Sequence, residues 1–275
     1  MSVDEKSVDP ILLTRFHVAC EDGDELCVEE FLNSTLDING KNKSRGDDTA
    51  LHAACHNCQC DIVSLLLSHG ANPEQRNAYG QTPLHVAYGY TSSATSAKKL
   101  ALVRMLLDRG ANVNARDKYG GTALHFFLDE ADIVKELLAR GATVNAQEKI
   151  GCWPVLHAAA SYGSLESVQL LLQAGANINA SDGCGNTTAL DVAYLRCYEI
   201  RACLEEALAN SWSRKAQREY LDIVIALAPL NLPAYILLWS LDWLPQFTSK
   251  PELAKIRLLE CVYESRRRIV AQRQE

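Results

Sequence analysis

The residues best suited to chemistry are histidines that recur along the chain and one short run of cysteines. Zinc binds Cys and His ligands at short spacings, and the run Cys55-His56-Asn57-Cys58-Gln59-Cys60 begins three residues after His52. A cysteine beside a histidine could also serve as a nucleophile. No second cysteine pair lies at the spacing usual for zinc sites, so we expect no metal and no other cofactor. The recurring histidines are His17, His52, His85, His125 and His157.

Other common signatures of catalysis are missing from the sequence. It contains no phosphate-binding glycine loop, no His-Glu-x-x-His pattern and no Gly-x-Ser-x-Gly pattern. The formal net charge is −7 and the pI is about 5.6, whereas a general nucleic-acid surface needs an excess of Lys and Arg. We therefore expect a protein that is not an enzyme and does not bind nucleic acid.

The elements that would position the histidines are repeats. Thr-Ala-Leu-His occurs at residues 49–52 and 122–125, and Thr-Pro-Leu-His occurs at residues 82–85. With three looser copies, the third position of the motif steps by 35, 33, 40, 32 and 34 residues. Four of the copies are followed by an apolar stretch and then by Gly-Ala-Asn or Gly-Ala-Thr. Three signals in register predict a repeat architecture. The looser copies lie at residues 14–17, 154–157 and 188–191.

This pattern resembles the ankyrin repeat family, whose unit is a β-turn and two antiparallel helices with a period of ~33 residues. The resemblance covers residues 10–208 and implies an all-α solenoid of about six helix-turn-helix units. The Thr hydroxyl can cap the first helix, and Pro83 suits the first helical turn. A glycine such as Gly70 lets the second helix end in a left-handed conformation. Stacking of neighbouring units supplies the stability.

The family resemblance also changes the interpretation of the histidines and cysteines. In the family, the recurring His joins the Thr hydroxyl to the backbone of a neighbouring unit, which is a structural role. Cys55 falls where the family has a buried Ala, so we expect its thiol to point into the core. We predict a solvent-accessible thiol at Cys58 or Cys60. A redox or zinc-dependent activity of residues 55–60 is the third functional hypothesis, behind two kinds of protein binding.

The third unit is longer than the others. Residues 89–100 (GYTSSATSAKKL) lengthen the link between its helices by about seven residues over the ~33-residue unit. The Gly, Ser and Thr content predicts a mobile loop, and long loops in compact domains are often functional. The fourth unit is short at the same place, and the fifth has an extra residue near Cys152 and Trp153.

Partner binding is the function that the resemblance implies. The family binds through its β-turn tips and the exposed face of its first helices, and exposed Tyr and Trp are typical interface anchors. Trp153 could instead fill the gap made by its own insertion. By position, the predicted binding residues are His56, Asn57, Tyr79, Gln81, Tyr90, Lys118, Tyr119, Ile150, Trp153 and Tyr162, with Ala78, Gly121, Lys149, Cys152 and Ser161 beside them.

The charge of the chain changes near residue 209. Residues 209–275 contain 10 Lys+Arg and 7 Asp+Glu, whereas residues 1–208 contain 17 and 27. The net charges are therefore +3 and −10. We divide the chain into an N-terminal tail (1–9), the repeats (10–208) and a helical segment (209–275).

Neither a secretory signal nor a membrane span is predicted. The first ten residues are polar and acidic, without the apolar core of a signal peptide. The most apolar stretch, residues 230–244, is shorter than the ~20 residues that a membrane span needs. We expect a monomeric cytoplasmic protein, with the nucleus as the alternative location, and the 10 cysteines as thiols.

The helical segment contains the sequence NLPAYILLWSLDWLP at residues 231–245. It resembles the opening of an F-box, which begins with Leu-Pro and runs into an apolar helix. Ankyrin proteins of the poxvirus type carry such a box at the C-terminus, and another ankyrin group carries a suppressor-of-cytokine-signalling box. Both boxes recruit ubiquitin-ligase scaffolds. In the suppressor box, Leu-Pro follows the apolar helix, so the F-box order fits better. The predicted adaptor-binding residues are Leu232, Pro233, Leu237, Leu238, Trp239 and Trp243.

Two functions are therefore open. The first is a non-catalytic scaffold that binds a protein partner through the turn tips and the first-helix face, with residues 209–275 as a helical cap on the solenoid. The second is a substrate receptor of a cullin-type ubiquitin ligase, whose repeats hold the target and whose residues 231–270 bind the adaptor. The sequence does not identify the partner.

Overall fold

The computed structural model describes residues 10–34, 36–89, 95–149, 151–183, 187–193 and 198–211. The predicted binding residues Tyr90 and Ile150 lie outside these ranges, and so does the whole of residues 212–275 with the predicted adaptor-binding residues. Residues 1–204 form one compact unit, and residues 205–275 are assigned to a second. Apart from residues 205–211 at the end of the last helix, every described residue belongs to the compact part formed by residues 1–204.

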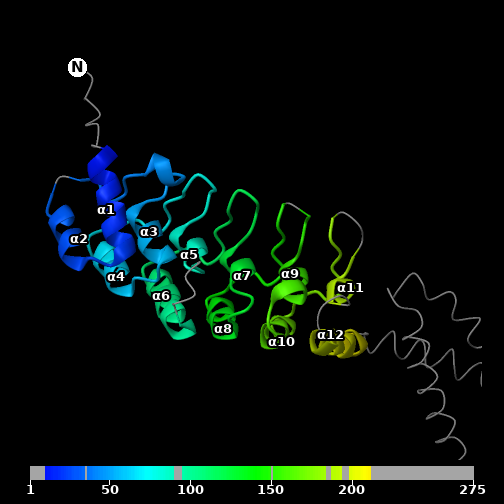
Figure 1. Ribbon diagram of the computed structural model, residues 1–275. Helices are drawn as coiled ribbons and strands as arrows, with labels where there is room; N and C mark the ends of the chain where they lie inside the picture. Colours follow the sequence, from blue (N-terminus) through cyan, green and yellow to red (C-terminus); the bar gives the residue numbers. More distant parts are fainter. Residues whose placement is uncertain are drawn as a thin grey trace, which may run out of the picture. The chain divides into compact units, whose positions relative to one another are not determined.

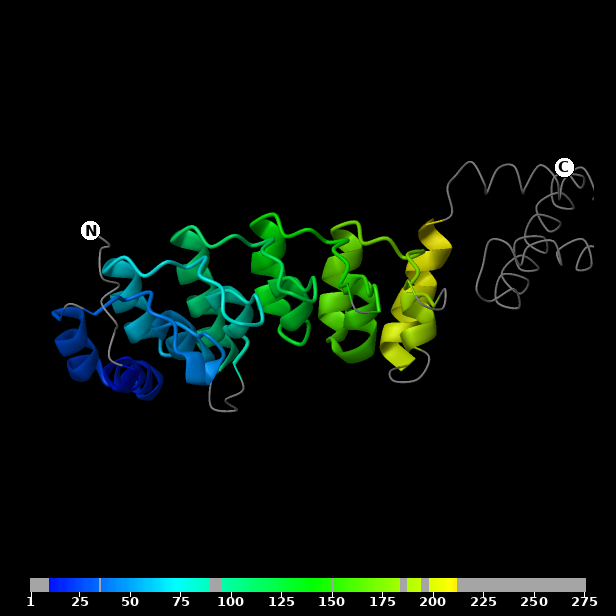
Figure 2. The same cartoon turned by 90° about the horizontal axis from the view of Figure 1, so that it is seen from above.

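Helices in the part of the chain that the structure describes form six consecutive pairs, which confirms the predicted all-α ankyrin-type solenoid (Figure 1). Within residues 1–204, the pairs lie side by side in chain order, and the turns between them project on one side as fingers (Figures 1 and 2). The helices are α1 (Pro10–Asp22), α2 (Glu25–Leu32), α3 (Ala50–His56), α4 (Cys60–Ser68), α5 (Pro83–Val86), α6 (Ser96–Asp108), α7 (Ala123–Phe126), α8 (Ala131–Ala139), α9 (Val155–Tyr162), α10 (Leu165–Gln173), α11 (Ala189–Ala193) and α12 (Tyr198–Ser211). The 3₁₀ turn η1 (Lys43–Arg45) lies in the finger that precedes α3, which we number as the second because each finger takes the number of the helix pair that follows it.

The core lies between successive helix pairs. Small side chains such as Ala54 and Ala159 are fully buried on the first helices, so neighbouring units pack closely. The second helices bury one apolar stripe each, such as Ile133, Val134 and Leu137 of α8. Because each stripe is covered only by the adjoining pairs, the units stabilise one another.

The recurring histidines are buried in this core, as the resemblance implied. His52 Nδ1 accepts a hydrogen bond from the Thr49 backbone N–H (3.2 Å) and lies 2.8 Å from the Thr49 hydroxyl. With Nδ1 as the acceptor, Nε2 carries the proton and donates to the Gln81 carbonyl of the next unit (3.0 Å). His85 repeats this arrangement with Thr82 and the Gly121 carbonyl. The neutral imidazole therefore both caps a helix and joins two units.

Four units depart from this arrangement. In the fifth, Pro154 stands where the other units have Thr, and His157 Nδ1 has no hydrogen-bond partner. The His17 ring nitrogens have no hydrogen bond of normal geometry. His125 Nε2 also lacks one, and burial lowers the pKa of His125 to about 4, while the Trp153 backbone acts in the opposite direction. In the sixth unit Asp191 replaces the histidine and accepts from both the backbone N–H and the hydroxyl of Thr188.

A second set of contacts between units recurs at the start of each finger. The backbone N–H of Asn72 donates to Asn39 Oδ1, and the N–H of Thr143 donates to Asn114 Oδ1 (2.8 and 2.7 Å). Glu74 and Asn145 accept in the same way from Asn112 and Asn177. Side chains at one repeat position thus bind the backbone of the following unit.

The long third unit is folded differently from the prediction. Helix α6 begins at Ser96, and the Thr95 side chain caps it by accepting from the Lys98 N–H. The predicted loop at residues 89–100 is therefore wrong for its last five residues, which are helical. Residues 90–94 lie outside the described chain. The helix forms because a Thr cap is followed by residues that tolerate helix.

Lys99 anchors this extra helical turn to the fourth unit. Its side chain is buried, with Nζ 3.0 Å from Glu130 Oε1 and 5.0 Å from the Tyr88 ring centroid. The Ser96 hydroxyl donates to the same carboxylate. Burial favours the neutral amine, but the hydrogen bond and charge of Glu130 outweigh it and raise the pKa of Lys99. The pair is therefore ionised and joins two units.

Replacing Glu130 by Gln is expected to lower the free energy of unfolding by about 2 kcal/mol, because the ammonium of a side chain that is only 11% exposed loses its counter-ion. Urea unfolding at pH 7 measures the loss. Glu136→Gln is the matched control: its partners Arg104 and Arg140 are more exposed, so the change should cost less than about 1 kcal/mol. Equal losses in the two variants would show that Lys99 does not need this carboxylate.

Candidate functional site

The fingers carry most of the predicted binding residues, and one buried side chain closes each of the two central fingers. Asn77 Oδ1 accepts from the backbone N–H groups of Tyr79 and Gln81 (2.9 and 3.0 Å). Asp117 Oδ1 does the same for Tyr119 and Gly121. This local side-chain bond turns the backbone sharply. The residue after each tyrosine is a glycine with positive φ, which an L side chain rarely adopts.

Backbone hydrogen bonds join the fingertips into a continuous row. The Ala78 N–H donates to the Gly46 carbonyl (2.7 Å), and the Lys118 N–H donates to the Tyr79 carbonyl (3.0 Å). The Lys149 N–H donates to the Tyr119 carbonyl (2.6 Å). Each tyrosine is thus followed by a lysine of the next unit. Tyr79 and Tyr119 are 52% and 47% exposed, so their rings are accessible at equivalent positions.

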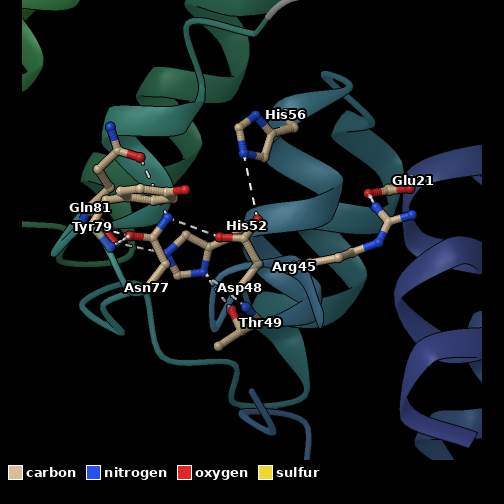
Figure 3. Close-up of polar contacts among 9 residues, drawn as sticks. All are labelled: Glu21, Arg45, Asp48, Thr49, His52, His56, Asn77, Tyr79 and Gln81. Atoms are coloured by element: carbon tan, nitrogen blue, oxygen red, sulfur yellow. Dashed lines mark hydrogen bonds and ion pairs between the residues drawn. The ribbon is translucent and has the colours of Figure 1, made fainter. Parts of the chain in front are cut away.

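A polar network joins the second and third fingers (Figure 3). Asn77 Nδ2 donates to Asp48 Oδ1 (2.9 Å), and His56 Nε2 lies 3.8 Å from Asp48 Oδ2. Burial lowers the pKa of His56, while the Asp48 carboxylate acts in the opposite direction. His56 comes from α3, whereas Tyr79 and Gln81 come from the third finger, and all three lie around these two side chains (Figure 3). The arrangement holds the finger in place and shows no group activated for catalysis.

The structure distributes the remaining predicted residues more widely. Tyr162 of α9 is half-exposed and donates its hydroxyl proton to the His125 carbonyl (3.0 Å). Burial raises its pKa to about 12. Trp153 is half-buried, with its ring centroid 6.4 Å from that of His157. Asn57 donates to the Glu21 carbonyl of the first unit (3.2 Å), which fixes it away from the row of tips.

Sequence reasoning missed three residues that shape this surface. Asp48 and Asn77 fix the second and third fingers, and Tyr88 donates to Asp129 Oδ2 of the next unit (3.2 Å). A signal for Asn77 is present in the sequence, because Asp117 and Asp182 occupy the same place in later repeats and also accept finger N–H bonds. Tyr88 and Asp129 share no such recurrence.

The cysteine run shows one correct and one wrong prediction. Cys55 is fully buried, as expected. Cys58 is only 5% exposed, so the prediction of an accessible thiol is wrong there; its positive φ lets it take the glycine position while its thiol turns inward. Cys60 is half-buried and donates to the Lys98 carbonyl (3.7 Å). Burial raises the pKa of both Cys58 and Cys60, which disfavours the reactive thiolate.

Metal binding is not indicated by the geometry. Over the residues that the structure describes, no three His, Cys, Asp or Glu side chains are placed to hold a metal ion.

Within the described ranges, no helix combines the length and hydropathy that crossing a lipid bilayer requires.

Replacing Asn77 by Ala should expose the Tyr79 and Gln81 amides to rapid hydrogen exchange and lower the free energy of unfolding by about 1–2 kcal/mol. Both amides lose their acceptor at once. Hydrogen–deuterium exchange with residue resolution measures this. Asn77→Asp keeps the accepting oxygen, as Asp117 does naturally, and should keep the amides protected; because it loses the Nδ2 donor to Asp48, only the protection of the amides is compared in this control. Protection that survives in the Ala variant would mean that Gly80 alone holds the turn.

The six helix pairs stack into a repeat solenoid, and a buried histidine lies between most of the pairs. Their aligned fingers form one continuous surface. The family model for ankyrin repeats (3 copies) matches residues 16–95, 91–182 and 126–204. The chain belongs to the ankyrin repeat family. Together these matches cover residues 16–204. Of the described residues, only 10–15 and 205–211 lie outside them.

Individual proteins agree with this assignment. The chain is similar to the crystal structure of an ankyrin repeat domain from Acinetobacter baumannii, with 28% identity, a TM-score of 0.58 and coverage of 70% of this chain and 96% of that one. It is 30% identical over 166 residues to tyrosine-protein kinase HTK16 of Hydra vulgaris, which is 60% of this chain and 17% of the kinase. It is 32% identical over 73 residues to human ankyrin repeat and SOCS box protein 9, which is 26% of this chain and 24% of that protein.

The family gives the function at a coarse level. Ankyrin repeats mediate protein–protein interactions, and ankyrin repeat domains are generally non-catalytic. The chain spans less than a quarter of the length of the kinase and of the SOCS box protein. The kinase activity named for the Hydra protein and the SOCS box named for the human protein are therefore properties of those two proteins.

Proposed function

We propose that this chain is a non-catalytic scaffold that captures a protein partner along the fingertips and the adjoining first-helix face. The observation that carries the proposal is the pair Tyr79 and Tyr119, which are exposed at equivalent positions of fingers that backbone bonds hold in a row. Tyrosines on a rigid support contribute large contact areas at low entropic cost. Tyr162 and Gln81 extend this surface. The cytoplasmic location expected from the sequence remains a prediction.

A capture experiment tests the proposal. Full-length wild type and the double variant Tyr79→Ser/Tyr119→Ser are immobilised and exposed to cell extract, and bound proteins are quantified by mass spectrometry. Tyr198→Ser is the matched control, because Tyr198 is 82% exposed but lies on α12, away from the fingers. Specific partners should fall at least ~10-fold with the double variant, as expected for two interface anchors. Partners retained equally by all three proteins would exclude the fingertips.

A second candidate function is a substrate receptor of a cullin-type ubiquitin ligase. The similarity to ankyrin repeat and SOCS box protein 9 supports it, together with the resemblance of residues 231–245 to an F-box opening. These residues lie outside the described structure. In this function, the repeats would hold the target while residues 231–270 bind the adaptor.

The two functions differ in what the C-terminal segment binds. Full-length chain with Trp239→Ala/Trp243→Ala should lose cullin adaptors and keep its other partners if the receptor function is correct. Trp153→Ala, a tryptophan change within the repeats, should keep the adaptors. If wild type captures no cullin adaptor, the receptor function is wrong, and residues 209–275 are better explained as the helical cap.

A further inference from the structure

Basic side chains are concentrated on one edge of the repeats, although the chain as a whole is acidic. We define the finger edge as residues 41–48, 76–81, 116–121, 147–149 and 151–153. None of its four acidic side chains, Asp47, Asp48, Asp117 and Glu148, is fully exposed. All of its basic side chains are exposed, and they are Lys41, Lys43, Arg45, Arg76, Arg116, Lys118 and Lys149. The finger edge thus presents positive charge, although residues 1–208 carry a net charge of −10.

The acidic charge lies mainly elsewhere. The second helices α2, α4, α8 and α10 carry seven acidic side chains and one basic one. Helix α6 is the exception, with Lys98, Lys99 and Arg104 against Asp108. An anionic ligand approaching this protein is therefore repelled by most of the second-helix side and attracted by the finger edge.

Contacts within the finger edge hold its cations in place without neutralising most of them. The Arg76 guanidinium donates to the carbonyls of Gly80 and Arg116 (2.8 and 2.5 Å), and the Arg116 guanidinium donates to the Gln147 carbonyl (3.0 Å). Lys41 donates to the Arg76 carbonyl in the same way. These acceptors carry no formal charge, so the positive charges persist. Arg45 differs, because it pairs with Glu21.

Lys118 and Lys149 are the cations of the finger edge that adjoin the two tip tyrosines. Neither has an acidic side chain within 4.0 Å among the described residues. Their stems pack on the tip glycines of the preceding fingers: a Cβ placed on Gly80 would lie 3.1 Å from Lys118 Cγ, and one on Gly120 would lie 3.0 Å from Lys149 Cγ. The backbone bonds place Lys118 beside Tyr79 and Lys149 beside Tyr119. An aromatic ring and an unpaired ammonium therefore alternate from unit to unit.

We propose that the finger edge binds an extended acidic segment of the partner protein, with Lys118 and Lys149 contacting its carboxylates and Tyr79 and Tyr119 packing on its backbone and side chains. This proposal rests on the proposed function and names the chemistry of its partner. An extended segment fits because the anchors recur once per unit along a row. A nucleic acid fits less well, because its dense charge would also face the acidic remainder of the repeats.

The test uses full-length protein and a fluorescein-labelled 12-residue peptide of alternating Glu and Gly, with binding followed by fluorescence anisotropy at 50 mM NaCl. A peptide with Gln in place of Glu is the uncharged control. The variant Lys118→Glu/Lys149→Glu reverses the charge at these two positions. The variant Lys98→Glu/Lys135→Glu makes the same change in net charge at exposed positions on α6 and α8. Thermal unfolding of each variant verifies its fold.

We expect the Glu peptide to bind wild type at least ~10-fold more tightly than the Gln peptide and at least several-fold more weakly at 200 mM NaCl. The Lys118/Lys149 variant should lose at least ~10-fold in affinity, and the Lys98/Lys135 variant less than about twofold. If both variants lose affinity equally, the binding reflects net charge only, and the proposal is overturned. Tighter binding of a labelled 12-nucleotide oligothymidylate through the same lysines would overturn it in favour of nucleic acid.

Failure of the acidic-segment site can be told apart from failure of the proposed function. If the Glu peptide does not bind, but proteins from extract are still lost with the Tyr79/Tyr119 variant, the fingertips bind a partner of different chemistry. In the opposite case, binding of the Glu peptide requires Lys118 and Lys149, but capture of extract proteins does not require Tyr79 and Tyr119. The acidic-segment site is then correct, and the capture of partners by the two tyrosines is wrong.

Discussion

Lowering the pH from 7 to 5 is expected to reduce the free energy of unfolding of this protein by about 5 kcal/mol. Burial lowers the pKa of His17, His52 and His125 to about 4, from the value of 6.5 that holds in the unfolded chain. The folded state therefore excludes protons that the unfolded state binds. Stability is fully present above pH 6.5 and is lost as the pH falls towards 4, at roughly 2 kcal/mol for each histidine by pH 5.

The geometry explains why these rings resist protonation. In His52, Nδ1 accepts from the Thr49 N–H, so a proton there would face a donor. Burial lowers the pKa of His85 as well, which adds to the effect. Urea unfolding midpoints at pH 7.5, 6.0 and 5.0 measure the dependence. His52→Gln should reduce the difference between pH 7.5 and 5.0 by about a third. Midpoints independent of pH would contradict the neutral buried rings.

The second large effect concerns Gly163, which should not tolerate Ala. Its φ of −77° is ordinary, but a Cβ there would lie 2.7 Å from the Ala159 carbonyl oxygen and 3.0 Å from that of Leu128. Both are backbone atoms, and Leu128 accepts the Ser164 N–H across the unit boundary (2.9 Å). Gly163→Ala should therefore lower the free energy of unfolding by about 3 kcal/mol, measured by urea unfolding at pH 7.5.

Gly175 gives the matched comparison. Its φ is +88°, but a Cβ there would meet nothing within 4 Å. Gly175→Ala should cost only about 1 kcal/mol for the left-handed backbone. The order of the two variants is the decisive result: if Gly175→Ala is the more damaging, close approach between the fourth and fifth units does not govern stability at Gly163.

These glycines also show what the sequence could and could not reveal. The left-handed role of Gly175 was predictable because Gly-Ala-Asn recurs at the end of several units. The crowding at Gly163 was not, because the obstructing Leu128 carbonyl belongs to another unit and no local pattern encodes it. The buried histidines and Cys55 were predicted because a repeat position determines their burial. Cys58 was misassigned because its backbone conformation was correct but the direction of its thiol depends on neighbouring side chains.

The candidate surface divides in the same way. Tyr79 and Tyr119 were predictable as exposed residues from their place in the finger. The row that they form depends on backbone bonds between residues 39 and 30 positions apart, Tyr79 with Lys118 and Tyr119 with Lys149, and no motif specifies that register. The exposure of all the basic finger residues likewise emerged only once the acidic ones were seen to turn inward. Lys99 was expected in a loop because an insertion in a repeat gives no sign of its own secondary structure.

The ends of the insertion in the third unit are both fixed by other units. A Cβ on Gly89 would lie 2.9 Å from the His56 carbonyl oxygen of the second unit, and Thr95 caps a helix that Lys99 ties to Glu130 of the fourth. The length of chain between the two ends can therefore change without altering the register of the stack, and doubling it costs only about 0.6 kcal/mol of closure entropy. This position is accordingly where the scaffold can acquire new sequence during evolution, or accept a grafted peptide, at the smallest cost to its fold.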